Sequence, residues 1–239
     1  MRENARALLG PASPGPTRWL LGKLLESYLR LTRLRDYDAY RLEHVHGMSI
    51  LVLPTVANPK LLRTGAFFAQ CLAAQLATGR NVLDMGTGTG VCALFAARHA
   101  SRVIAVDINR AAVRCAGINA ALNHLEHRVE VRHGDLFGPV SGERFDLVLF
   151  NPPFLKGAPR DERDAAWRSN DVAMRFAAGL GAHLAPGGAA LLLLSSFGNA
   201  CESFIDELRS RGFSISVFAR RRYVNETVTV FRVTPREEA

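Results

Sequence analysis

The tetrapeptide Asn151-Pro152-Pro153-Phe154 directly follows Phe145–Phe150, an apolar stretch with the length of a buried strand. The side-chain carbonyl of Asn151 and the backbone carbonyl of Pro152 can both accept hydrogen bonds from a planar amino group. Such bonds would turn the nitrogen lone pair out of conjugation, while Pro153 stiffens the turn and Phe154 offers a ring for stacking. The pattern predicts a site that aligns a planar nitrogen and needs no strong general base.

A glycine-rich turn, Asp84-Met-Gly86-Thr87-Gly88-Thr-Gly90, separates an earlier apolar strand from a helix. Such a turn lets a ligand lie against the backbone at the helix N-terminus and the carboxyl edge of a sheet. The G-x-G-x-x-G spacing of dinucleotide dehydrogenases is absent, because position 91 is valine. The G-K-[ST] ending of a phosphate-binding P-loop is absent too.

Two further acids follow the next two apolar strands. Asp107 ends the second strand, with Asn109 close by, and Asp135 with Leu136 comes after the third. A carboxylate can accept both hydroxyls of a ribose, and an acid beside an apolar residue suits the amino group and ring face of adenine. A single acid at such a place is most often a cap or a solvated loop residue. Three acids at the ends of three consecutive strands predict a nucleoside site.

Short apolar strands alternate with helices from residue 81 onward, which predicts a doubly wound, mostly parallel seven-stranded sheet of the α/β class. The expected strands are 81–85, 102–106, 128–132, 145–150, 189–195, 213–218 and 226–233, and the expected helices are 91–99, 110–122, about 164–183 and 200–211.

The N-terminal region has a different pattern. We expect a helix from Thr17 to about Arg35, and then a β-hairpin over residues 40–53 with Gly47 in its turn. A helix over 61–77 begins the larger unit. The sequence therefore predicts an N-terminal extension, residues 1–58, followed by a main domain, residues 59–239.

Composition excludes several classes of protein. The 239 residues are 48% hydrophobic and 22% charged with a net charge of +8, which indicates a folded globular chain and excludes intrinsic disorder. No apolar run has the length of a membrane helix, and nothing resembles a signal peptide, so we expect a cytoplasmic protein. The four cysteines form no C-x-x-C pair, and His44 and His46 have no third ligand nearby, so no metal site is expected.

Together these motifs resemble the class I S-adenosylmethionine-dependent methyltransferases over roughly residues 60–235. The resemblance implies that Gly86, Thr87, Gly88 and Gly90 border the methionine and ribose portions of S-adenosyl-L-methionine, with Asp84 near the methionine end. It further implies that Asp107 and Asn109 lie at the ribose, and that Asp135 and Leu136 frame the adenine. Asn151–Phe154 resembles the motif of enzymes that methylate adenine N6, guanine N2 or protein glutamine, with Asn151 also close to the cofactor.

The identity of the methyl acceptor stays open. A protein glutamine and a nucleic-acid base are both expected partners, and a small-molecule amine or a non-catalytic cofactor-binding scaffold are alternatives. Trp167 is either a stacking residue or part of a helix core. Arg220–Arg222, expected between the last two strands, is either a phosphate-binding cluster or a solvated loop.

Overall fold

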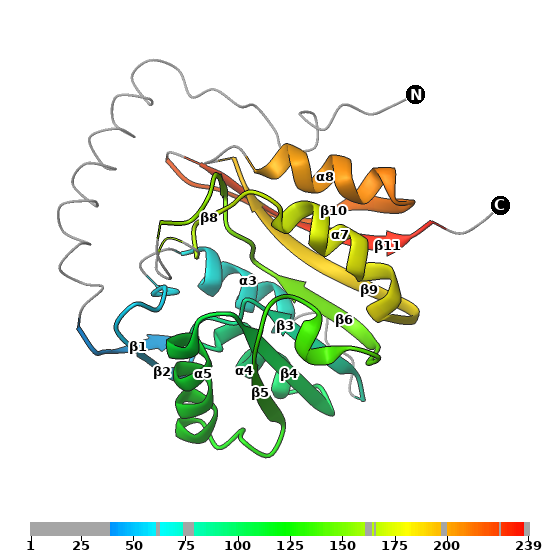
Figure 1. Ribbon diagram of the computed structural model, residues 1–239. Helices are drawn as coiled ribbons and strands as arrows, with labels where there is room; N and C mark the ends of the chain where they lie inside the picture. Colours follow the sequence, from blue (N-terminus) through cyan, green and yellow to red (C-terminus); the bar gives the residue numbers. More distant parts are fainter. Residues whose placement is uncertain are drawn as a thin grey trace.

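The computed structural model describes residues 39–60, 63–73, 79–160, 164, 166–196, 200–224 and 226–236. Within them the chain forms a small β-hairpin followed by a seven-stranded sheet with helices on both faces (Figure 1). The helix predicted between Thr17 and Arg35 lies outside the described residues.

The main sheet confirms the predicted fold class. Its strands follow the spatial order β10-β11-β9-β6-β3-β4-β5. The five strands from β9 to β5 are parallel, and β11 is antiparallel to both of its neighbours. The strand bounds are β3 Asn81–Met85, β4 Arg102–Asp107, β5 Val129–His133, β6 Phe145–Phe150, β9 Leu184–Ser195, β10 Phe213–Arg222 and β11 Thr227–Pro235.

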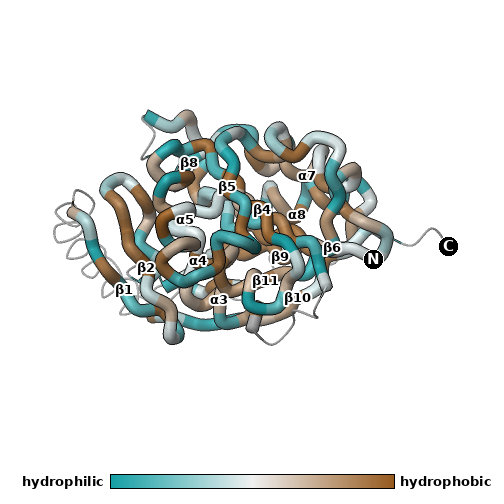
Figure 2. Tube along the Cα trace, turned by 90° about the horizontal axis from the view of Figure 1, so that it is seen from below, coloured by the Kyte–Doolittle hydropathy of each residue, from teal (hydrophilic) through white to brown (hydrophobic). Residues whose placement is uncertain are grey.

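Helices cover the two faces of this sheet, and alternate residues of each strand pack against them. On β6, Leu147 and Leu149 join the apolar cluster under the first helices, whereas Val148 and Phe150 join the cluster under the last two. Apolar residues accordingly concentrate on the central strands (Figure 2). None of the helices among the described residues is long and apolar enough to cross a membrane. The helices are α3 Thr64–Ala73, α4 Val91–Ala97, α5 Arg110–Leu122, α7 Val172–His183 and α8 Cys201–Ser210, with a 3₁₀ turn at Gly138–Val140.

The N-terminal hairpin is present as predicted, with β1 at Arg41–Val45 and β2 at Met48–Val52. Gly47 in its turn has φ +82°, a conformation that favours glycine. Ile50 of β2 is fully buried in the same apolar cluster as α3 and α4. The hairpin therefore shares a core with the sheet, and the division at residues 58 and 59 stays a prediction.

The helix expected over about 164–183 is wrong over residues 166–171, because α7 begins only at Val172. Before it, β8 (Arg168–Ser169) pairs in parallel with β7 (Leu155–Lys156). The backbone N–H of Leu155 donates to the carbonyl of Trp167 (2.8 Å). This pairing with the segment after Asn151–Phe154 gives these residues an extended conformation that their own sequence does not predict.

The expected position of Arg220–Arg222 in a loop is also wrong. These residues are the last of β10 and pair with Thr229, Val228 and Thr227 of β11 after a bulge between Val217 and Ala219. The N–H of Tyr223 donates to the carbonyl of Glu226 (2.7 Å), which makes the connecting turn short. The backbone pairing with β11 therefore keeps these three arginines in an extended strand, which their own sequence does not predict.

Replacing the buried Ile50 tests whether the hairpin unfolds together with the sheet. We expect Ile50→Ala to lower the free energy of unfolding by about 2–5 kcal/mol, because it leaves a cavity in the shared core. Leu42→Ala on the same hairpin is the control, since Leu42 is 59% exposed, and it should change the value by less than about 0.5 kcal/mol. Urea unfolding followed by circular dichroism measures both, and equal small effects would contradict a shared core.

Candidate active site

A cleft of about 500 Å³ opens at the carboxyl ends of β3, β4 and β6. The predicted site residues come together there with one exception, Gly90, which does not line it. Those that line it are Asp84, Gly86, Thr87, Gly88, Asp107, Asn109, Asp135, Leu136, Asn151, Pro152, Pro153 and Phe154.

Gly90 has a different role from the other two glycines of the turn. It has φ +82° just before α4, and a Cβ there would lie 3.1 Å from the Cα and Cβ of Ala116 on α5. A Cβ on Gly88, by contrast, would meet nothing within 4 Å. Glycine at position 90 thus lets the turn pack closely against α5, while Gly88 leaves the space beside the backbone open.

Asp84 is buried and holds the glycine-rich turn against α4. Its Oδ2 accepts hydrogen bonds from the Thr87 hydroxyl (2.6 Å) and from the backbone N–H of Ala93 (3.0 Å). Burial raises the pKa of this carboxyl to about 7, against the lowering effect of both hydrogen bonds, and the nearby charge of Asp107 adds to the rise. Asp84 is therefore a structural clamp at the wall of the cleft.

Asp107 joins the same turn to the end of β4. Its two oxygens accept the backbone N–H groups of Gly88 and Asn109, each at 2.9 Å. Burial raises the pKa of Asp107, although these backbone hydrogen bonds lower it. Each carboxylate oxygen has a second lone pair, so this side chain retains the capacity to accept hydroxyl groups of a ligand.

The carboxylate of Asp135 already has a partner, Arg175 on α7, with which it forms an ion pair. Nη1 of Arg175 also lies 3.7 Å from Oδ2 of Asp171. Asp135, Asp171 and Arg175 all line the cleft. Both members of the Asp135–Arg175 pair are more than 40% exposed, so the pair contributes little to stability. The sequence gives no sign of Arg175, because it lies 40 residues further along the chain.

Two residues that line the cleft, Asn151 and Arg168, have a buried polar atom that makes no hydrogen bond to the described residues, and Arg168 Nε lies 3.3 Å from Oδ2 of Asp164. Oδ1 of Asn151 is buried and has no hydrogen-bond partner among the described residues. Leaving a buried carbonyl unpaired costs about 1–3 kcal/mol, so an incoming donor would gain this interaction. The flanking residues are fixed: Pro152 and Phe154 are buried, and the carbonyl of Phe154 accepts the N–H of Ala200 (3.2 Å). Trp167, held by the β7–β8 pair, is partly buried and lines the same cleft.

A buried asparagine on α5 joins the glycine-rich turn to the N-terminal hairpin. The side-chain amide of Asn119 donates to the carbonyls of Thr89 (2.9 Å) and Leu51 (2.7 Å), and its oxygen accepts the N–H of Leu51 (2.7 Å). One turn later, Asn123 makes the equivalent pair of bonds to Ser49. Sequence reasoning missed this link, whose one signal is two asparagines four residues apart in an Ala-rich helix.

The buried carboxyl of Asp84 predicts a pH dependence of stability. Because its pKa is higher in the folded than in the unfolded chain, its contribution is fully present below about pH 4 and is lost as the pH rises toward 7. The loss is on the order of 4 kcal/mol. We expect the free energy of unfolding of the ligand-free chain to fall more steeply over this range than that of Asp84→Asn. Urea unfolding at intervals from pH 4 to 8 measures it, and a constant difference between the two proteins would contradict the assignment.

The two asparagines of α5 provide a matched pair of substitutions. We expect Asn119→Leu to accelerate hydrogen exchange at the backbone amides of Gly88 and Gly90, because the turn loses its bond to α5. Asn123→Leu removes the same number of bonds to the hairpin and leaves the turn intact. It should therefore accelerate exchange in the hairpin alone. Equal exchange at Gly88 and Gly90 in both variants would show that Asn119 does not hold the turn.

Comparison with known proteins agrees with this geometry. Residues 53–211 match the family model described as the methyltransferase small domain. A protein of Methanocaldococcus jannaschii, provisionally named as a protein N5-glutamine methyltransferase, is 33% identical over 161 residues, covering 63% of this chain and 79% of that protein. Ribosomal RNA small subunit methyltransferase C of Alcanivorax borkumensis is 38% identical over 107 residues, covering 45% of this chain and 30% of that protein.

A solved structure has the same fold. The 16S rRNA N2 G1207 methyltransferase of T. thermophilus, in complex with AdoMet and guanosine, superposes with a TM-score of 0.59 at 21% identity, covering 83% of this chain and 50% of that one. The chain thus spans most of the Methanocaldococcus protein but no more than half of the other two proteins. It belongs to the methyltransferase small domain family, and the prediction of a class I methyltransferase is confirmed.

Proposed function

We propose that this chain uses S-adenosyl-L-methionine to methylate a planar amino or amide nitrogen, in a nucleic-acid base or a protein glutamine. The observation that carries the proposal is the buried Oδ1 of Asn151 in the cleft, which has no hydrogen-bond partner in the part of the chain that the structure describes. A buried carbonyl oxygen in this state fits an acceptor group that brings its own N–H donor.

The cleft fits the proposed cofactor by the chemistry of its donors. The space beside Gly88 admits a ligand close to the backbone. The remaining lone pairs of Asp107 suit the two hydroxyls of a ribose, and Asn109 lies next to them. Leu136 offers an apolar contact for an adenine ring, beside the Asp135–Arg175 pair. Gly86 and Thr87 form the remaining wall of the cofactor site. Asp84 does not contact the cofactor in this proposal but positions Thr87 by accepting its hydroxyl hydrogen bond.

The protein's part in the chemistry is alignment. S-adenosyl-L-methionine, when bound, supplies a methyl group on a positively charged sulfur. Asn151 Oδ1 and the carbonyl of Pro152 accept the two hydrogens of the acceptor's amino group, which directs its lone pair out of the plane. Pro153 limits the backbone motion of this turn, and Phe154 and Trp167 give apolar surface to a planar acceptor. The proton that the nitrogen loses passes to water, so the site needs no strong base.

Removing the Asn151 carbonyl tests the proposal. We expect Asn151→Ala to lower kcat by about a hundredfold or more, since it removes an interaction made with the reacting nitrogen. The dissociation constant for S-adenosyl-L-methionine, measured by calorimetry, should stay within about threefold. Transfer of a labelled methyl group to protein, RNA, DNA and small-molecule fractions of a cell extract measures activity.

Asn170→Ala is the matched control, because Asn170 also lines the cleft but is exposed. It should retain nearly full activity. Full activity in Asn151→Ala, or equal losses in the two variants, would contradict the role given to Asn151.

A further inference from the structure

An arginine near the start of α7 holds one of the acids of the cleft. Nη2 of Arg175 donates to Oδ2 of Asp135, which follows β5, and the two side chains form an ion pair. Both residues line the cleft. No described residue donates a hydrogen bond to the other oxygen of this carboxylate, Oδ1. The pair therefore presents one occupied and one open oxygen to a molecule that enters the cleft.

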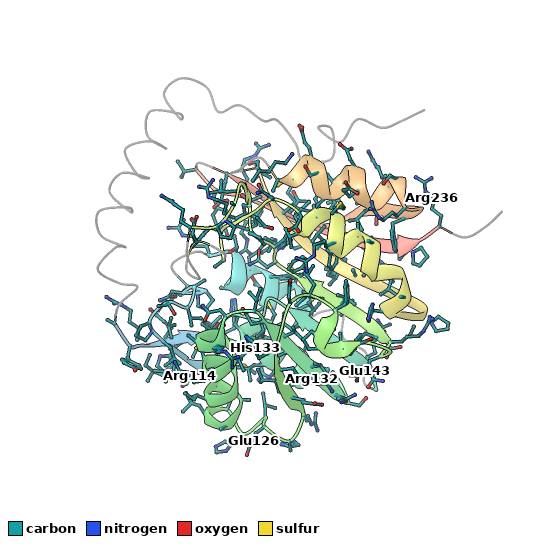
Figure 3. All side chains as sticks on the ribbon, viewed as in Figure 1. Arg114, Glu126, Arg132, His133, Glu143 and Arg236 are labelled. Atoms are coloured by element: carbon teal, nitrogen blue, oxygen red, sulfur yellow. The ribbon has the colours of Figure 1, made fainter. Side chains whose placement is uncertain are left out.

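The backbone that carries Asp135 is fixed, so the side chain is the part that can move. The turn begins directly after His133, the residue that ends β5 (Figure 3). The N–H of Gly138 donates to the carbonyl of Asp135 (3.0 Å). Leu136 has φ +46°, a left-handed conformation that is uncommon outside glycine. The direction of the carboxylate thus depends on its contact with Arg175.

Aromatic contacts fix the helix that carries Arg175. Phe176, the next residue, is fully buried, and its ring centroid lies 5.6 Å from that of Phe137 and 4.7 Å from that of Phe150. Phe137 belongs to the segment that follows Asp135, so these contacts join α7 to the turn itself. The packing accordingly holds the guanidinium of Arg175 beside Asp135.

The charge of Arg175 is balanced within the cleft. Its Nη1 lies 3.7 Å from Oδ2 of Asp171, so two carboxylates surround one guanidinium. An anionic group would be repelled by this net negative charge, whereas a neutral N–H donor would gain a hydrogen bond to the open oxygen of Asp135. The cluster therefore favours an uncharged hydrogen-bond donor.

The order of the strands indicates which part of the cofactor lies here. Along the edge of the sheet, β6, β3, β4 and β5 are consecutive neighbours. In the proposed function the reacting methyl group lies beside Asn151, after β6, and the ribose lies beside Asp107, at the end of β4. The base then extends past β4 to the turn after β5, where Asp135 and Leu136 line the cleft. The open oxygen of Asp135 is therefore on the side that receives the base.

We infer that Arg175 is a positioning residue, which holds the Asp135 carboxylate toward the 6-amino group of the cofactor's adenine and makes the site select adenine over a 6-oxopurine. The inference rests on the proposed function. Adenine donates an N–H from position 6, whereas hypoxanthine carries a carbonyl oxygen there, which a fixed carboxylate repels. Without Arg175 the carboxylate, whose side chain is 43% exposed, can turn into water and the repulsion is relieved.

Ligand binding is the state in which this ion pair has its effect. In the free chain the pair is exposed to water, which weakens it. A base that lies on Leu136 covers the pair and excludes water, which strengthens the attraction between its charges. We therefore expect Arg175 to affect ligand selectivity more than the stability of the free chain.

The test compares two ligands that differ only at position 6 of the purine, S-adenosyl-L-homocysteine and S-inosyl-L-homocysteine, by calorimetry. We expect the chain to bind the adenine ligand about 30-fold more tightly, since a hydrogen bond to a charged group contributes a factor of about 10–100. Arg175→Met should reduce this preference to about threefold or less, chiefly by weakening the adenine ligand. An unchanged preference in Arg175→Met would overturn the inference.

A double variant tests whether Arg175 acts through Asp135. Asp135→Asn should lose the preference, because a carboxamide can offer either its oxygen or its NH₂ group to position 6. Adding Arg175→Met to Asp135→Asn should then change the affinity for the adenine ligand by less than about twofold, since the group that Arg175 positions is already gone. A full additional loss in the double variant would show that Arg175 acts independently of Asp135 and would overturn its positioning role.

Arg102→Met is the matched control. Arg102, at the start of β4, is also paired with two carboxylates, Glu130 and Glu143, and its side chain is 46% exposed against 42% for Arg175. Glu143 lies apart from His133 at the end of β5 (Figure 3). This control should keep the full preference, and both methionine variants should unfold thermally within about 4 °C of the original chain. An equal loss of preference in the two variants would contradict the inference.

The same titrations separate the inference from the proposed function. Failure of both ligands to bind the original chain would contradict the proposed function, and the inference with it. Equal affinity of the original chain for the two ligands would overturn the inference alone and leave the proposed function in place.

Discussion

Burial of both faces of the central strands is the constraint on which the arrangement of the site depends. On β6, the side chains from Leu147 to Phe150 enter two separate apolar clusters in turn, so this part of the strand has no room for a polar group on either face. Polar residues are confined to the strand ends. Because β3, β4 and β6 are parallel, their carboxyl ends meet at one edge of the sheet. Asp84, Asp107 and Asn151 lie at or just after these ends and are therefore brought together in the cleft.

At this edge most polar groups are occupied in holding the backbone. The oxygens of Asp84 and Asp107 bind the glycine-rich turn and the start of α4, and Asp135 is paired with Arg175. Asn151 differs, since its buried oxygen has no protein partner among the described residues. The distinction separates residues that build the cleft from one that is available to an acceptor.

The parts of the site that sequence could predict are those encoded within a few residues. The glycine-rich turn, the acids after the strands and Asn151–Phe154 each depend on the strand that immediately precedes them, and their positions agree with the structure. Arg175, Asn119 and the strand pairing of Trp167 depend on segments distant in sequence, and no local pattern reports them. The helix expected from residue 164 and the loop expected at Arg220 are wrong for the same reason: β7 and β11 supply hydrogen-bond partners that override local preference.

The Asn119 side chain joins the N-terminal hairpin to the glycine-rich turn through its hydrogen bonds to Leu51 and Thr89. Because one side chain bonds to both segments, a displacement of Leu51 also disturbs the bond to Thr89. The segment that follows the hairpin lines the cleft at Thr55 and Val56. The hairpin therefore supports the wall of the cleft as well as sharing the core of the sheet.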